Sequence, residues 1–173
     1  NNATLSRINH NLTISLWIKD NGTRSNQAYI GMSEGGNRTQ IDVDSSGFRF
    51  RIDTTAGVNY ATSGFGGRDT KWHNLVLTVN GTNATMFLDY STMRNRTVDG
   101  YINWSQGGQR LAKIGGASSC ISNATIDEVS IWNRSLSSSE VAQVYNAGLF
   151  KNGTNIGIFD SGILDAGSQI YWG

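Results

Sequence analysis

The sequence predicts an all-β sandwich or barrel that carries one short helix near its C-terminal end. Short runs of alternating apolar and polar residues recur along the chain, with turn dipeptides between them. Glycine is frequent, with 21 residues, and proline is absent. One segment, near residue 140, has apolar residues at helical spacing instead. The 173 residues are enough for one domain with its own core.

The first predicted strand covers residues 11–19, where every second residue from Leu12 to Ile18 is aliphatic. This period of two is typical of a strand with one buried face. The dipeptide Asn21-Gly22 follows and predicts a turn.

The clearest hairpin joins residues 72–80 to residues 84–90 through a linker that contains Gly81. The remaining strands are expected at residues 28–32, 38–44, 48–53, 58–62, 94–98, 111–115 and 125–132.

The predicted helix covers residues 138–147. Ser137 and Glu140 have the spacing of a capping box, and apolar residues recur at helical spacing from Val141 to Tyr145. The glycine that follows is expected to end the helix and to close the sandwich region.

Composition and charge exclude several classes of protein. The 14 basic residues are scattered and the formal net charge is +1, so no nucleic-acid partner is expected. No apolar run approaches the length of about 18 residues that would indicate a membrane span. An apolar content of 38% with 16% charged residues is typical of a folded chain. The single cysteine, Cys120, excludes an internal disulfide and is expected to be a small buried side chain.

Asparagine sequons are about three times more frequent than chance. Eleven of the 18 asparagines begin Asn-X-Ser/Thr, whereas the 34 serines and threonines would complete about 3.5 such triplets at random. Accidental sequons in an Asn-, Ser- and Thr-rich chain are the alternative. N-glycans are bulky and lie on the surface of exported proteins, so we expect a heavily N-glycosylated protein, extracellular or at the cell surface. The predicted acceptors are Asn2, Asn11, Asn21, Asn37, Asn80, Asn83, Asn95, Asn103, Asn123, Asn133 and Asn152.

Five blocks of sequence carry a family resemblance. They are LTISLWIK at residues 12–19, KWHNLVLTV at 71–79, MFLD at 86–89, ATIDEVSIWNRSLS at 124–137, and the helix at 140–148. In this order they resemble laminin-G-like domains, which are concanavalin A-like. The resemblance implies a two-sheet antiparallel jelly-roll sandwich, a fold shared with lectins, pentraxins and many adhesive extracellular modules.

The chain departs from the family at both ends. Such domains usually open with a further strand, which residues 1–10 do not match, and residues 150–173 extend beyond the family's helix. We therefore divide the chain into a laminin-G-like sandwich at 1–149 and a β-prone extension at 150–173.

The extension is expected to supply the missing strand, either to its own domain or to the next subunit as a donor strand. Head-to-tail donation would build a filament. The alternatives are that the extension only packs on its own domain, or that it begins another domain. Its expected assembly contacts are Ile156, Ile158, Phe159, Ile163, Leu164, Ile170, Tyr171 and Trp172.

The sequence predicts no enzyme and no catalytic residue. Asp42 and Asp44 lie two apart on one strand, but the glutamates of concanavalin A-like glucanases are missing beside them, so a solvated strand face is expected. The histidines are His10 and His73, and the resemblance implies a structural role for His73. No metal ligand set can be assembled around two isolated histidines.

Two functions fit the sequence, and we expect the first, with the second as the alternative. The extension and the sequons favour a glycan-coated structural subunit of a surface filament or adhesin, which self-associates. The resemblance favours a carbohydrate- or protein-binding module of a larger secreted protein. We expect no cofactor and no metal site. The alternative, which the resemblance implies for the module, is a calcium site with Asp127 as the matching acid, although a turn-capping role for Asp127 is the stronger expectation. Trp104 and Trp172 are candidate sugar contacts, but a glycan on Asn103 would compete with a ligand at Trp104.

Overall fold

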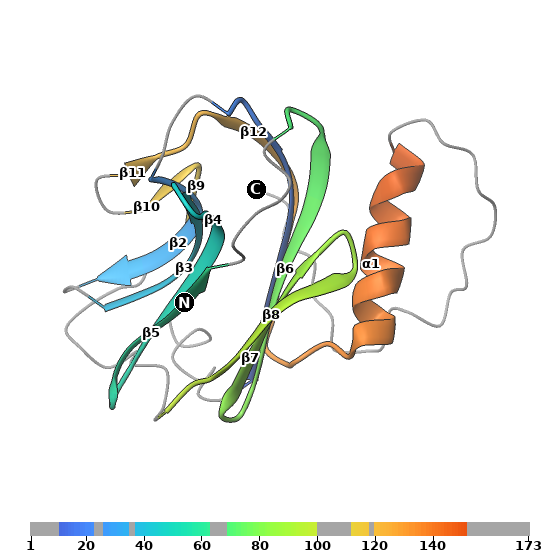
Figure 1. Cartoon of the computed structure of the whole chain (residues 1–173). Helices are drawn as coiled ribbons and strands as arrows, with labels where there is room; N and C mark the ends of the chain where they lie inside the picture. Colours follow the sequence, from blue (N-terminus) through green and yellow to red (C-terminus); the bar gives the residue numbers. More distant parts are fainter. Residues whose placement is uncertain are drawn as a thin grey trace, which may run out of the picture.

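Alternating side chains give the strands apolar faces, and two antiparallel sheets of five strands each pack these faces together (Figure 1). The computed structural model describes residues 11–22, 26–34, 37–62, 69–99, 112–117 and 120–151. The prediction of an all-β, two-sheet antiparallel sandwich with one helix is confirmed.

The first sheet, sheet A, has the strand order β12-β1-β6-β7-β8. Its strands are β1 (Asn11–Asp20), β6 (Trp72–Asn80), β7 (Asn83–Leu88), β8 (Ser91–Thr97) and β12 (Ala124–Trp132). The second sheet, sheet B, has the order β5-β4-β3-β2-β9. Its strands are β2 (Gln27–Glu34), β3 (Asn37–Asp44), β4 (Gly47–Thr54), β5 (Gly57–Thr62) and β9 (Ala112–Ile114).

Two further elements complete the described structure. A small ribbon pairs β10 (Gly116–Ala117) with β11 (Cys120–Ile121), and the sequence pattern did not predict these two short strands. The helix α1 (Ser138–Lys151) lies on the outer face of sheet A, away from sheet B (Figure 1).

The core lies between the sheets and consists of the inward side chains of both. Sheet A contributes aliphatic residues such as Leu16 and Leu77, and sheet B contributes Phe48 and Phe50, all of which are fully buried. Burial of each such side chain contributes about 1.5–3 kcal/mol to the free energy of unfolding.

Strand β1 is buried on both faces, so the prediction of a half-buried strand was wrong. Its position between β12 and β6 buries the inward face, and α1 covers the outward face. The outward Trp17 stacks on Tyr145 of α1 with ring centroids 5.4 Å apart. The outward Thr13 donates its hydroxyl to the Arg134 carbonyl at 2.8 Å and accepts from the Leu136 amide at 2.9 Å.

The helix does not end at Gly148 but continues to Lys151, across the expected domain boundary at residues 149/150. Gly148 lies inside the helix, where it packs against Trp17. A Cβ atom at this position would lie 2.1 Å from the Trp17 Nε1 atom, so only glycine lets α1 approach the indole this closely. Glycine here reflects close packing rather than chain termination.

The hairpin partner of β6 ends two residues earlier than predicted. Asp89 and Tyr90 have φ angles of 49° and 59°, which ends β7 at Leu88, and β8 then begins at Ser91.

Several expected residues lie outside the described part of the chain. They are His10, Trp104, the sequons Asn2, Asn103 and Asn152, and the assembly residues Ile156, Ile158, Phe159, Ile163, Leu164, Ile170, Tyr171 and Trp172. The strand-donation hypothesis therefore stays a prediction.

Candidate functional site

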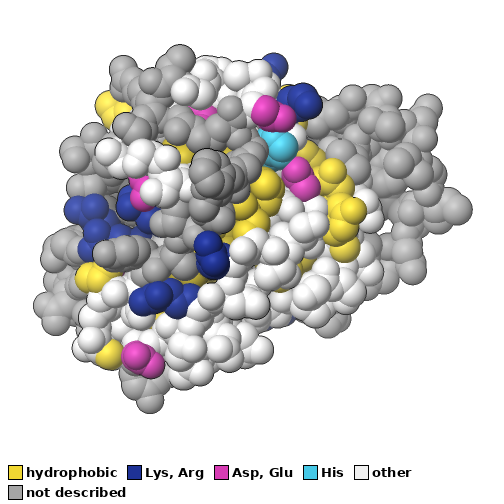
Figure 2. Space-filling view, in the orientation of Figure 1, with side chains coloured by type: hydrophobic (Ala, Val, Ile, Leu, Met, Phe, Trp, Pro, Cys, Tyr) yellow, Lys and Arg dark blue, Asp and Glu magenta, His cyan; other side chains and the backbone are white. Residues whose placement is uncertain are grey.

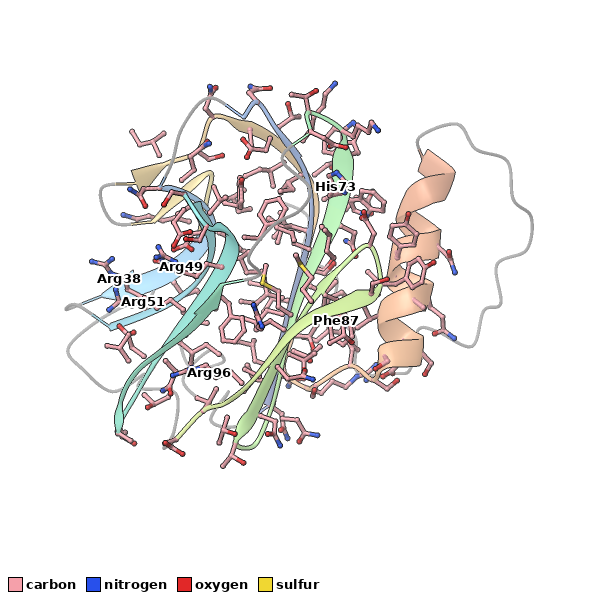
Figure 3. The ribbon with its side chains drawn as sticks, in the orientation of Figure 1. Arg38, Arg49, Arg51, His73, Phe87 and Arg96 are labelled. Carbon is pink, nitrogen blue, oxygen red and sulfur yellow. The ribbon has the colours of Figure 1, made fainter. Side chains whose placement is uncertain are left out.

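The outer face of sheet B carries a network of charged and amide side chains. On β3 and β4 the residues between the core positions alternate outward, which places acidic and basic side chains on one surface. The strand register sets Asp42 opposite Arg49 and Gln40 opposite Arg51. Arg38, Arg49 and Arg51 lie on this side of the molecule in Figure 3, and Figure 2 shows basic side chains gathered there. We call these side chains, together with Asp44 and Asp53, the sheet B network.

Arg49 holds two carboxylates at once. Its Nε and Nη2 atoms donate to the two oxygens of Asp42 at 2.7 and 2.9 Å, and its Nη1 atom donates to Asp44 at 3.0 Å. The Asp42 side chain is only 4% exposed. The expectation of a solvated strand face was therefore wrong for Asp42. Its carboxylate is buried, and the bidentate hydrogen bonds from Arg49 offset the cost of removing its charge from water.

Arg51 holds Asp53 in the same way. Its Nε and Nη2 atoms donate to the two Asp53 oxygens at 2.8 and 3.0 Å. Asp53 also accepts the Arg38 backbone amide at 2.8 Å. The network is thus fixed to the backbone as well as within itself.

Gln40 is the incompletely satisfied member of the network. Its Nε2 atom donates to Asp42, whereas its buried Oε1 atom accepts no hydrogen bond. The neighbouring residues across the β2 pairing are Gly31 and Ala28, whose small side chains leave Gln40 and Asp42 without a bulky neighbour on that side. A buried acceptor without a donor costs about 1–3 kcal/mol and is a group that a ligand can satisfy.

A groove of about 330 Å³ lies on the other side of the molecule, between the start of α1 and the outer face of sheet A. None of its described lining residues is charged. The lining consists of Thr78, Asn80, Asn83, Thr85, Phe87, Thr92, Asn95, Ser135, Leu136, Ser137 and Ser138.

The capping box at the start of α1 is confirmed. Glu140 accepts the Ser137 amide at 2.7 Å, and the Glu140 amide donates to the Ser137 hydroxyl at 3.3 Å. The hydrogen bond from the Ser137 amide, aided by Arg134, lowers the pKa of the Glu140 carboxyl. The Ser137 and Glu140 side chains thus satisfy the exposed backbone amides at the start of the helix.

His73 lies between two carboxylates near the start of the central strand β6, and Figure 2 shows the histidine between acidic side chains. Its Nδ1 atom is 2.6 Å from Asp89 and its Nε2 atom is 2.9 Å from Asp69. Burial opposes the charged ring, but the hydrogen bonds to Asp69 and Asp89 prevail and raise the pKa of His73 above its usual value. The same contact from His73, with the Lys71 amide, lowers the pKa of Asp69 to about 2. Asp89 also accepts the Asn74 amide at 2.9 Å, so this cluster fixes the turn after β7.

The sequon asparagines whose side chains the structure describes all lie on the surface. They are Asn11, Asn21, Asn80, Asn83, Asn95, Asn123 and Asn133. By contrast, Asn59 and Asn74, which do not begin sequons, are buried. The backbone of Asn37 belongs to β3, at the tip of the hairpin with β2.

Most of these asparagines gather at the two ends of sheet A. Asn11 pairs with Asn80, and Asn80 pairs with Asn83, at one end. Asn21 lies beside Asn123 at the other end, where their side chains approach to 3.4 Å.

Asp127 is exposed and accepts the amide of Glu128, whose φ angle is 53°. Both residues lie within β12, where the register against β1 shifts, so this contact belongs to a β-bulge and not to the turn cap that the sequence predicted. Within the described ranges no group of three His, Cys, Asp or Glu side chains could hold a metal ion. Calcium binding stays a prediction.

The sequence pattern could have revealed the sheet B network. The alternation Phe48-Arg49-Phe50-Arg51-Ile52-Asp53 places three charges on one strand face, and Gln40, Asp42 and Asp44 have the same spacing. The sequence pattern does not show the register that pairs these side chains, nor that the Gln40 Oε1 atom lacks a hydrogen-bond donor.

A protein-family model described as the concanavalin A-like lectin/glucanases superfamily, of laminin G type, matches residues 1–142. The chain belongs to this family. Among curated protein sequences, none matches the chain. No helix of the described residues is long and apolar enough to cross a membrane.

Solved structures of toxin binding domains have the same fold. The binding domain of botulinum neurotoxin DC in complex with SialylT matches with a TM-score of 0.67 and 16% identity, over 85% of this chain and 37% of that chain. The binding domain of Paraclostridial Mosquitocidal Protein 1 matches with a TM-score of 0.63 and 16% identity, over 80% of this chain and 37% of that chain. The binding domain of botulinum neurotoxin DC in complex with rat synaptotagmin II matches with a TM-score of 0.65 and 15% identity, over 80% of this chain and 36% of that chain. The chain thus spans little more than a third of these proteins, and the likeness is one of fold.

Proposed function

We propose that this chain is a non-enzymatic, N-glycosylated, extracellular binding module that holds a carbohydrate ligand on the outer face of sheet B. The observation that carries the proposal is the buried, unpartnered Oε1 atom of Gln40 within an otherwise ordered polar network. Domains of this family are generally binding modules, and the similar toxin domain was solved in complex with SialylT and in complex with rat synaptotagmin II.

A carbohydrate fits this chemistry because it presents many hydroxyl groups in fixed directions. A sugar hydroxyl can donate to Gln40 and accept from an arginine of the network at the same time. Arg49 and Arg51 are already held by carboxylates, so little side-chain entropy is lost when a ligand contacts them. Arg51 is the cross-strand neighbour of Gln40, so a ligand that contacts this arginine lies beside the Gln40 amide.

The same network argues against glycoside hydrolysis. That reaction needs one carboxyl group able to give up a proton and a second that acts as base or nucleophile. Asp42, Asp44 and Asp53 each bind a guanidinium group instead. A carboxylate neutralised in this way is poorly suited to either task.

N-glycosylation is supported by the exposure of the sequon asparagines. Every described sequon side chain lies on the surface, although buried asparagines occur elsewhere in the same sheets. Most of the described sequon side chains lie at the ends of sheet A, and none of them lies on β3 or β4.

The test uses the full chain secreted from a host that makes N-glycans. Ligands are first identified on a glycan array, and their affinities are then measured by calorimetry. We expect Gln40→Met to abolish detectable binding. The melting temperature is measured alongside, because the change removes both the unsatisfied acceptor and the amide that donates to Asp42. Gln143→Met makes the same change at an exposed position of α1 and is expected to bind normally. Unchanged affinity in the Gln40 variant would contradict the proposal.

A second candidate is the structural subunit of a filament, and the partly exposed edge of sheet A favours it. In the described part of sheet A, β12 is an edge strand. Its inward side chains, such as Ile126 and Ile131, are only partly buried against the core. An added strand would cover them.

The second candidate is tested by removing residues 152–173, which follow α1. Strand donation predicts that the full chain forms large particles in light scattering and that the shortened chain remains monomeric. Equal particle sizes for the two chains would rule out donation by this segment.

A further inference from the structure

The groove beside α1 has the chemical character of a sugar site. Hydroxyl and amide side chains make up its rim, and two apolar side chains, Phe87 and Leu136, lie among them. Both are almost fully buried, and they belong to the small core beneath α1. In Figure 3, Phe87 lies on β7 on the side of sheet A that faces the helix. An uncharged polar rim with an apolar floor matches an N-acetylated sugar, which has hydroxyls and one methyl group.

Three of the lining residues are also sequon asparagines, and they differ in their positions. Asn80 and Asn83 face each other on either side of the turn of the β6–β7 hairpin, where a glycan can extend into solvent. Asn95 lies in the middle of β8, directly opposite Thr85. A sugar attached to Asn95 must therefore lie against the lining of the groove.

The size of the groove limits its occupant. A volume of about 330 Å³ is at the lower end of the range of about 300–1,000 Å³ for small-molecule sites, which is enough for one or two sugar rings. A covalently attached sugar is present at high effective concentration, so even weak contacts hold it in place.

We infer that the groove between α1 and β6–β7–β8 seats the first sugars of the N-glycan on Asn95. The inference rests on the N-glycosylation in the proposed function and adds a fixed position for one glycan. The N-acetyl methyl group contacts Phe87 and Leu136, and the ring hydroxyls contact the Thr and Ser side chains of the rim.

This arrangement also protects an exposed strand. Strand β8 is an edge of sheet A in the described residues, and nearly all of its side chains are exposed. A glycan at its centre prevents another chain from pairing with it.

The experiment measures how quickly a peptide-N-glycosidase releases each glycan from the folded, secreted full chain, with site occupancy followed by mass spectrometry. Asn21 is the control, because it is an exposed sequon at the far end of sheet A. We expect release at Asn95 to be at least about tenfold slower than at Asn21, which corresponds to a contact of about 1.4 kcal/mol.

A matched pair of variants tests whether the groove or strand β8 causes the slow release of the glycan at Asn95. Ser138→Tyr fills the groove from its helix wall, whereas Ser139→Tyr changes the next residue, which does not line the groove. We expect the first variant to bring release at Asn95 close to the rate at Asn21, and the second to leave it slow. Slow release in both variants would assign the protection to the strand and overturn the inference.

The remaining outcomes distinguish the inference from the proposed function. Equal release rates at Asn95 and Asn21, or an empty Asn95 on a chain that carries other glycans, would overturn the inference and leave the proposed function standing. A chain without glycans at any sequon would overturn both the N-glycosylation and the inference.

Discussion

At the scale of single residues, the buried Asp42 explains why the sheet B network is rigid. A carboxylate that is 4% exposed needs a cation, and Arg49 supplies two hydrogen bonds to it. Loss of one partner from such a pair typically costs about 3–5 kcal/mol, because a charge is left buried alone. The network is therefore held in one arrangement before any ligand arrives. Gln40 shares this arrangement through its hydrogen bond to Asp42.

Gly148 provides a prediction at this scale. We expect Gly148→Ala to lower the free energy of unfolding by about 1–3 kcal/mol, as overpacked sites do, because the new methyl group would overlap the Trp17 indole. Urea denaturation followed by tryptophan fluorescence measures the change.

Two further variants test the cause of that loss. Asn146→Ala, at an exposed position of the same helix, is expected to leave stability unchanged or slightly raised. Combining Gly148→Ala with Trp17→Phe, which makes room for the methyl group, should recover part of the loss. A neutral effect of Gly148→Ala alone would contradict the close contact.

His73 predicts a dependence of stability on pH. Its pKa is raised above 6.5 in the folded state, so the charged ring stabilises the fold below that pH. This contribution is lost as the pH rises through the folded pKa. We expect the native chain to be more stable in urea at pH 6 than at pH 8.5, and His73→Gln to remove most of this difference. His10→Gln should retain the difference, and an unchanged pH profile in the His73 variant would refute the assignment.

Asp69 acts in the opposite pH range. Its pKa is lowered from 3.8 to about 2, so its contribution is present above 3.8 and is lost as the pH falls toward 2. The cluster thus stabilises the β7–β8 turn most strongly above pH 3.8 and below the folded pKa of His73.

At the scale of elements, the start of α1 depends on Ser137 as its N-cap. We expect Ser137→Ala to cost about 0.5–2 kcal/mol and to speed hydrogen exchange in the first turn of the helix. Ser138→Ala, one residue later, is the control and should leave exchange nearly unchanged. Exchange rates that respond equally to both changes would show that the cap does not hold the helix.

The strands of this fold could be predicted from the period-two pattern, because each sheet has one face in the core. The pattern gave a wrong prediction of burial where the helix α1 forms a third layer on sheet A. Strand β1 is buried on both faces by α1, and the glycine within α1 serves packing against Trp17. Such contacts join residues 131 positions apart and leave no local signal at Gly148.

At the scale of the whole molecule, the two outer faces differ. The outer face of sheet A is covered by α1 and flanked by sequons, whereas that of sheet B carries the polar network. The sequons could be recognised from the sequence, and their exposure agrees with that reading. The alternating charges of β3 and β4 could be recognised too, but the pairing of these charges and the unpaired Gln40 oxygen depend on the β3–β4 register, which the sequence does not specify.

The central claim is that sheet B binds the ligand, and nuclear magnetic resonance tests it most directly. The glycosylated chain, labelled with ¹⁵N, is titrated with an oligosaccharide that binds on the glycan array. We predict shifts of the Gln40 side-chain amide and of the Arg49 and Arg51 Nε–H signals, with little change at Gln143. Shifts confined to the α1 side of sheet A would contradict the account.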